Sequence, residues 1–69
     1  MHLVQDIKKR REVLQVSQED LAALSGVGLR TLKQFERGKG NPTLKTLVKL
    51  ADVLGMEVCL KIKKMPADS

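Results

Sequence analysis

Residues 17–38 read SQEDLAALSGVGLRTLKQFERG and contain two short helical patterns separated by a Gly-Val link. Ser17, followed three residues later by Asp20, is typical of a capping-box helix start. Gly26 ends this first pattern, and a second pattern runs from about residue 28 to residue 37 before another glycine. Two short helices joined by a tight turn that contains glycine form a helix-turn-helix, so this segment predicts that motif.

The segments on either side of the motif predict two further helices. In residues 3–15 one face carries, at spacings of three and four, Val4, Ile7, Arg11 and Leu14, of which Arg11 is the one charged member. Residues 44–54 follow Thr43, a good N-cap, and carry a second apolar stripe that ends before Gly55. The chain is therefore expected to be mainly α, with one helix-turn-helix domain of four to five helices over residues 3–55.

Beyond Gly55 the apolar residues alternate with polar ones, which is typical of a half-buried strand. A lone strand leaves its backbone groups unpaired, and a 69-residue chain with one cysteine and one histidine has neither a disulfide nor a zinc site to support its small core. We therefore predict that residues 56–64 form a C-terminal β-strand that pairs across a homodimer, followed by a disordered tail at residues 65–69. The predicted dimer interface comprises Met56, Val58, Cys59, Leu60 and Ile62.

The net charge of +5 is concentrated in the middle of the chain. Residues 1–25 are neutral, residues 26–40 carry four positive and one negative side chain, and residues 41–69 carry five and three. Concentrated basic charge favours a polyanionic partner, most often nucleic acid, although charge alone also fits a merely soluble basic surface.

A helical wheel of residues 28–37 separates a basic front from an apolar back. Leu32 and Phe35 point one way, and the polar side chains point the other. Arginine and glutamine side chains can form paired hydrogen bonds with guanine and adenine in the major groove. The residues expected to read DNA bases are Leu29, Arg30, Thr31, Lys33 and Gln34.

Residues around this helix are candidates to hold DNA phosphates. Gln18 lies in the first turn of its helix, where backbone N–H groups and the helix dipole favour an anion. The predicted phosphate contacts are Arg10, Gln18, Arg37, Lys39 and Asn41. Arg11 and Glu36 instead lie toward the apolar sides of their helices, where each is costly to bury alone, so we expect them to form a structural salt bridge.

The stretches SQEDLA, FERGKGNPTL and LADVLGM resemble the Cro/C1-type (XRE) helix-turn-helix family, over nearly all of residues 3–56. The resemblance implies a phosphate contact for Gln18, base contacts for Leu29, Arg30, Thr31 and Gln34, and an internal salt bridge between Arg11 and Glu36. Two departures are a glutamine, Gln15, at a turn position where the family has glycine, and Gly28 with Leu29 where many members have serine or threonine. The first requires a left-handed turn at some cost, and the second weakens the N-cap.

The strand at the end of the chain makes it most similar to the HipB-type antitoxins. That resemblance implies a homodimer that represses its own operon by binding a palindromic operator and that binds a HipA-like kinase toxin. Two other functions remain open: a protein-binding module with little DNA affinity, and a solitary regulator of the phage or mobile-element type.

Other function classes find little support in the sequence. One terminal histidine, three scattered serines and no paired carboxylates offer no catalytic set, cofactor site or metal site, so an enzyme is not expected. The chain has no apolar run long enough for a membrane span and no secretion leader, which favours a cytoplasmic protein. Cys59 is either a small strand residue or a redox switch.

Overall fold

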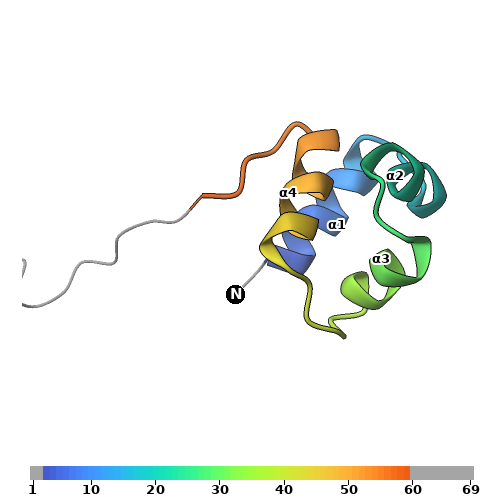
Figure 1. The fold of residues 1–69 in the computed structure, drawn as a ribbon. Helices are drawn as coiled ribbons and strands as arrows, with labels where there is room; N and C mark the ends of the chain where they lie inside the picture. Colours follow the sequence, from blue (N-terminus) through green and yellow to red (C-terminus); the bar gives the residue numbers. More distant parts are fainter. Residues whose placement is uncertain (1–2, 60–69) are drawn as a thin grey trace, which may run out of the picture.

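The computed structural model describes residues 3–59, which form four helices. They are α1 (Leu3–Val13), α2 (Gln18–Ser25), α3 (Leu29–Glu36) and α4 (Leu44–Val53). Figure 1 shows α2 and α3 joined by a short turn, with α1 and α4 packed beside them. The mainly α, helix-turn-helix architecture predicted from the sequence is confirmed.

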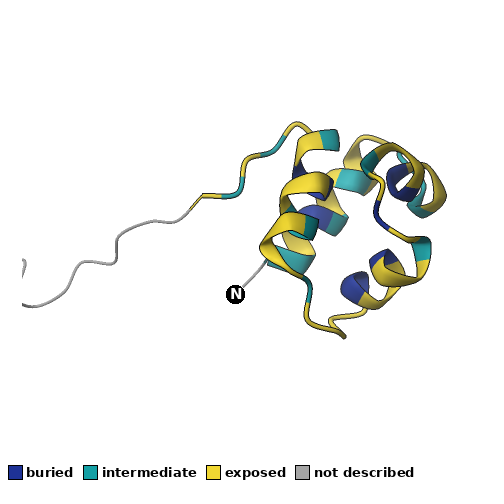
Figure 2. Ribbon diagram, in the orientation of Figure 1, coloured by how far each residue is buried: buried dark blue, intermediate teal, exposed yellow. Residues whose placement is uncertain are grey.

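Each helix contributes at least one apolar side chain to a single core. The largest side chains that are fully buried are Ile7, Leu21, Leu32, Leu50 and Leu54. In Figure 2 the buried positions lie on the inner faces of the ribbons, and the outer faces are exposed. Burial of these apolar faces, more than helix propensity, stabilises helices as short as α2 and α3.

Local capping sets the starts of two helices. Asp20 donates its backbone N–H to the Ser17 hydroxyl at 3.0 Å, and Thr46 donates in the same way to the Thr43 hydroxyl at 3.1 Å. Helix α3 has no such cap, because its N-cap residue is Gly28. The weak N-cap expected for the third helix is therefore present.

The turn between α1 and α2 corrects the predicted end of the first helix. We expected that helix to extend to Gln15, with Leu14 on its apolar face, but α1 ends at Val13 and Leu14 is 42% exposed. Gln15 has φ of 58°, the left-handed conformation expected for it. Leu14 still donates its backbone N–H to the Arg10 carbonyl at 3.0 Å, and the left-handed Gln15 that follows ends the right-handed helical path.

Residues 56–59 follow α4 without forming a helix or a strand. Figure 1 shows this segment leaving the helical domain, although Met56 still donates a backbone hydrogen bond to Ala51 at 2.9 Å and packs partly against the core. The predicted strand is therefore not observed in the part of the chain that the structure describes. Leu60, Ile62 and the predicted tail lie outside the described residues.

Candidate nucleic-acid interface

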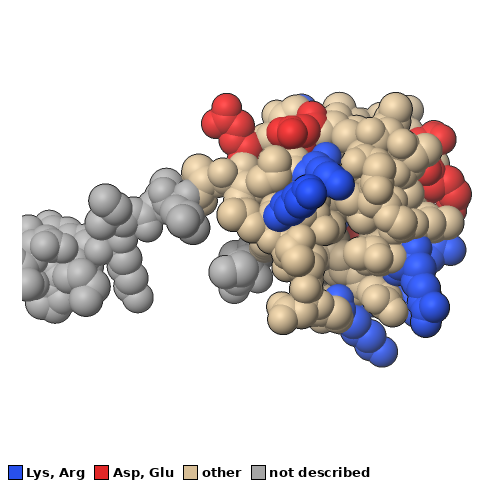
Figure 3. All heavy atoms as spheres, viewed as in Figure 1, with Lys and Arg blue, Asp and Glu red and all other residues tan. Residues whose placement is uncertain are grey.

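Helix α3 has one buried face and one exposed face. Leu32 and Phe35 are 0% and 2% exposed, so they anchor the helix in the core. Leu29 is half-buried against the core, whereas the polar side chains predicted to read bases are exposed: Arg30, Thr31, Lys33 and Gln34. Figure 3 shows basic side chains at the lower right, beside α3, and acidic side chains along the upper edge and over α2.

A polar hollow lies between α1, α2 and α3. Its volume is about 390 Å³, and it is lined by Lys8, Arg11, Gln18, Lys33, Glu36 and Arg37. Lys33 and Arg37 are exposed and Lys8 is half-buried, whereas Glu36 is buried. The hollow therefore combines four cations with one buried carboxylate.

Arg11 and Glu36 form a two-bond ion pair at the floor of the polar hollow. Nε and Nη2 of Arg11 donate to Oε2 and Oε1 of Glu36 at 2.7 and 2.8 Å, and Nη1 donates to the Val16 carbonyl at 2.8 Å. The side chains are 13% and 3% exposed. Since both groups are paired and hydrogen-bonded, the pair links α1 to α3 without leaving a lone buried charge.

Gln18 extends this cluster to α2. Its Nε2 donates to Glu36 Oε1 at 3.0 Å, and the residue is half-buried at the first position of α2. Gln18 is therefore more than an ordinary surface glutamine, because its amide is tied to the last residue of α3.

The cluster also lowers the pKa of Glu36. Desolvation by burial alone raises the pKa of this carboxyl, but hydrogen bonds from Arg11 and Gln18, with the nearby charges of Arg11 and Lys8, outweigh it. The hydrogen bond to Glu36 raises the pKa of Arg11 in turn. Both side chains are therefore charged in the folded protein at neutral pH.

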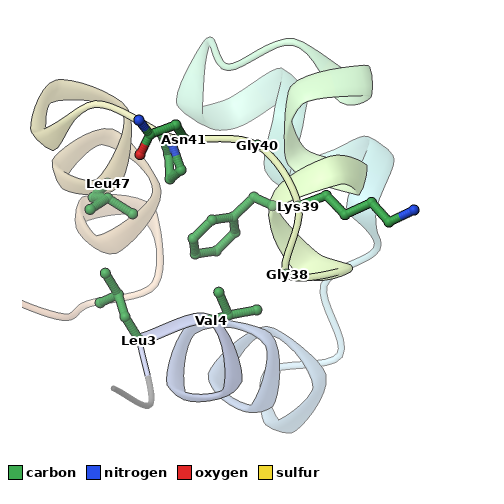
Figure 4. Close-up of a pocket in the computed structure, with 9 residues that line it drawn as sticks. Leu3, Val4, Gly38, Lys39, Gly40, Asn41 and Leu47 are labelled. Carbon is green, nitrogen blue, oxygen red and sulfur yellow. The ribbon is translucent and has the colours of Figure 1, made fainter.

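Lys39 and Asn41 lie in the loop that follows α3. Both are exposed, and with Thr31 and Gln34 they line a second hollow beside the exposed face of α3. Figure 4 shows the Lys39 side chain pointing away from the apolar pocket formed by Leu3, Val4 and Leu47. The loop therefore places these two residues next to the residues expected to read bases.

The structure does not bring Arg10 together with the other predicted phosphate contacts. Its Nε donates to the Leu54 carbonyl at 3.0 Å, at the end of α4. It lines a different surface, together with Lys9 and Met56. Lys8 lines the polar hollow instead, and sequence reasoning missed it. Its position three residues before Arg11, and so on the same side of the helix, is the signal that could have identified it.

Among the described residues, no helix is long and apolar enough to cross a membrane. Nor do residues 3–59 contain a group of three or more histidine, cysteine or carboxylate side chains that could hold a metal ion.

Comparison with known proteins identifies relatives of this fold. Residues 7–60 match the family model described as helix-turn-helix. The chain is 40% identical over 67 residues to an uncharacterized HTH-type transcriptional regulator of Sinorhizobium fredii, a match that covers 96% of this chain and 34% of that protein. It is 31% identical over 58 residues to the cryptic phage CTXphi transcriptional repressor RstR of Vibrio cholerae, covering 84% and 52%. An uncharacterized HTH-type transcriptional regulator of Haemophilus influenzae is 40% identical over 53 residues, covering 77% and 54%. The chain thus spans about a third to a half of the length of these relatives.

Proposed function

Because the chain belongs to the Cro/C1-type (XRE) helix-turn-helix family, we propose that it is a transcriptional repressor that binds operator DNA with α3 in the major groove. The observation that carries the proposal is the division of α3 into two faces. Its apolar residues are held in the core, and its basic and amide side chains are exposed on the other face.

The exposed face of α3 suits base recognition. Arg30 can donate two hydrogen bonds to guanine, and Gln34 can pair with adenine, each good pair contributing roughly 1 to 3 kcal/mol of discrimination. Thr31 can contact a thymine methyl group, with Leu29 at the start of the helix, and Lys33 can reach either a base or a phosphate. These roles make α3 the element that selects the operator sequence.

The surroundings of α3 suit the DNA backbone on both sides. Gln18 and Arg37 contact phosphate at the polar hollow, and Lys39 and Asn41 contact it from the loop after α3. For the contact from α1 we propose Lys8 in place of Arg10, because Lys8 lines the polar hollow and Arg10 holds the end of α4.

A homodimer would let two copies of α3 read a palindrome whose half-sites lie about 34 Å apart. Its proposed contact is the alternating segment at residues 56–64, paired antiparallel near Cys59 or Leu60. Glu57 then lies opposite Lys61 or Lys63 of its mate, which is a favourable cross-strand pair. The support for this dimer is the alternating sequence and the small size of the core.

The finer proposal is that the repressor is the autoregulating antitoxin of a HipBA-like pair, supported by the same C-terminal alternation. The competing role is a solitary phage-type regulator, which the similarity to a phage repressor favours. The reading frame next to the gene distinguishes the two roles. Co-purification with a kinase encoded there supports the antitoxin, and the absence of such a kinase gene favours the solitary regulator.

DNA binding is tested with a duplex selected by the purified chain from a randomised library. If each subunit of a dimer neutralises three or four phosphates, log K falls with log salt at a slope of roughly −6. A slope near zero would exclude the proposal and favour a protein-binding module.

A pair of charge reversals locates the interface. Arg30→Glu with Lys33→Glu should abolish binding to the selected duplex. The matched control is Lys45→Glu with Lys49→Glu, which makes the same change in net charge on the exposed surface of α4 and should retain most of the affinity. Equal losses in both variants would contradict a reading role for α3.

A further inference from the structure

Glu36 is an acidic residue at a surface proposed to bind phosphate. Its side chain is 3% exposed, yet it lies at the floor of the polar hollow, among the cations that line it. An isolated carboxylate there would repel DNA. Arg11 neutralises it with two hydrogen bonds, one to each oxygen, and Oε1 accepts a third bond from Gln18.

The third hydrogen bond constrains the Gln18 amide. A carboxylate can only accept hydrogen bonds, so Glu36 binds the amide nitrogen of Gln18 and not the amide oxygen. Nε2 of Gln18 is therefore held toward Glu36. Nε2 carries a second N–H, which this orientation leaves for another acceptor. The start of α2 is itself fixed by the Ser17 cap, so the side chain is constrained at both ends.

We infer that Glu36 is a positioning residue that holds the Gln18 amide ready to donate to a DNA phosphate. This inference rests on the proposed function, since it deepens the role of Gln18 in DNA binding. Glu36 is the last residue of α3, so the same bond ties the phosphate contact on α2 to the helix that reads bases. The ordering of a flexible side chain before binding is worth roughly a 2- to 12-fold gain in affinity.

The experiment is a double-mutant cycle of Gln18→Ala and Glu36→Gln, measured as affinity for the duplex selected by the wild-type chain. Glu36→Gln keeps the shape of the side chain, but its amide can present either a donor or an acceptor to Gln18. Gln18→Ala should weaken binding about 10-fold in the wild type, because the lost bond is to a charged group. In the Glu36→Gln background the same truncation should weaken binding only about 3-fold or less, because part of the benefit of positioning is already lost.

The control cycle replaces Gln18→Ala with Gln34→Ala. Gln34 is exposed and makes no side-chain hydrogen bond to Glu36 in the described residues. Gln34→Ala should weaken DNA binding by the same factor in the wild-type and Glu36→Gln backgrounds. If Glu36 were purely structural, its replacement would alter the effects of Gln18→Ala and Gln34→Ala on DNA affinity alike. A coupling to Glu36 that is seen for Gln18 and not for Gln34 therefore supports the positioning of the Gln18 amide.

A measurement on the wild type alone covers the case in which Glu36→Gln does not fold. The side-chain amides of Gln18 and Gln34 are compared by ¹⁵N relaxation in the free protein. The Gln18 amide should be the more ordered of the two. Equal mobility, or equal losses on Gln18→Ala in both backgrounds, would overturn the inference. Failure of the wild type to bind any selected duplex overturns the proposed function, and this inference with it.

Discussion

The replacement Glu36→Ala tests the ion pair at the centre of the domain. It removes the acceptor of two hydrogen bonds from Arg11 and one from Gln18. Breaking a fully buried pair by removing one partner costs about 3 to 5 kcal/mol. Arg11 is 13% exposed and keeps its bond to the Val16 carbonyl, so part of its charge stays compensated. We therefore expect a loss of about 2 to 4 kcal/mol in the free energy of unfolding.

That loss is large for a domain of this size. At roughly 0.05 to 0.15 kcal/mol per residue, a 69-residue chain has about 3 to 10 kcal/mol of stability. Each kcal/mol shifts the Tm of such a domain by about 4 to 8 °C, so Glu36→Ala should lower Tm by roughly 8 to 32 °C. Urea unfolding followed by circular dichroism measures the free-energy change directly.

Two variants make this experiment specific. Asp52→Asn removes an exposed negative charge from α4 and should leave the free energy of unfolding nearly unchanged. Arg11→Met combined with Glu36→Leu replaces both charges by apolar groups and should recover most of the loss, because no lone charge remains. A change below about 0.5 kcal/mol for Glu36→Ala would refute the structural role of the pair.

The fold makes three further predictions. Because hydrogen bonds from Arg11 and Gln18 outweigh desolvation and lower the folded-state pKa of Glu36 below its ordinary value of 4.5, its contribution to stability is complete above that value. As pH falls from 4.5 through the lowered pKa, the stability that ionised Glu36 contributes is lost. The free energy of unfolding, measured as a function of pH, should therefore fall less for Glu36→Gln than for the wild type. Identical pH profiles would count against a stabilising charge on Glu36. Gln15→Gly should raise the free energy of unfolding by about 0.5 to 1 kcal/mol, because glycine tolerates the positive φ; a destabilised variant in chemical unfolding would contradict this. Deletion of residues 57–64 should yield a chain that sediments as a monomer, and a truncated chain that remains dimeric would eliminate the proposed strand pairing.

The helix-turn-helix could be predicted because its signals are local. Ser17, Gly26 and the apolar positions of α2 and α3 determine caps, turn and buried face within one short segment. The left-handed turn at Gln15 was also foreseeable. The exposure of Leu14 was not, because helical spacing places Leu14 on the apolar face but does not reveal whether another element covers that end of the helix. Alternation at residues 56–59 similarly indicates a preference for a strand but provides no pairing partner.

The choice of Lys8 over Arg10 as the proposed phosphate contact on α1 depends on a tertiary contact that the sequence does not show. Residues 8–11 are four consecutive cations, and successive side chains on a helix point about 100° apart, so the four face different directions. Position on the first helix alone made Arg10 the predicted phosphate contact. The bond from Arg11 to Glu36 fixes the side of α1 that faces α3. Relative to Arg11, Lys8 then lies about 60° away and Arg10 about 100° away in the opposite sense. Lys8 therefore reaches the polar hollow, and Arg10 turns toward the end of α4.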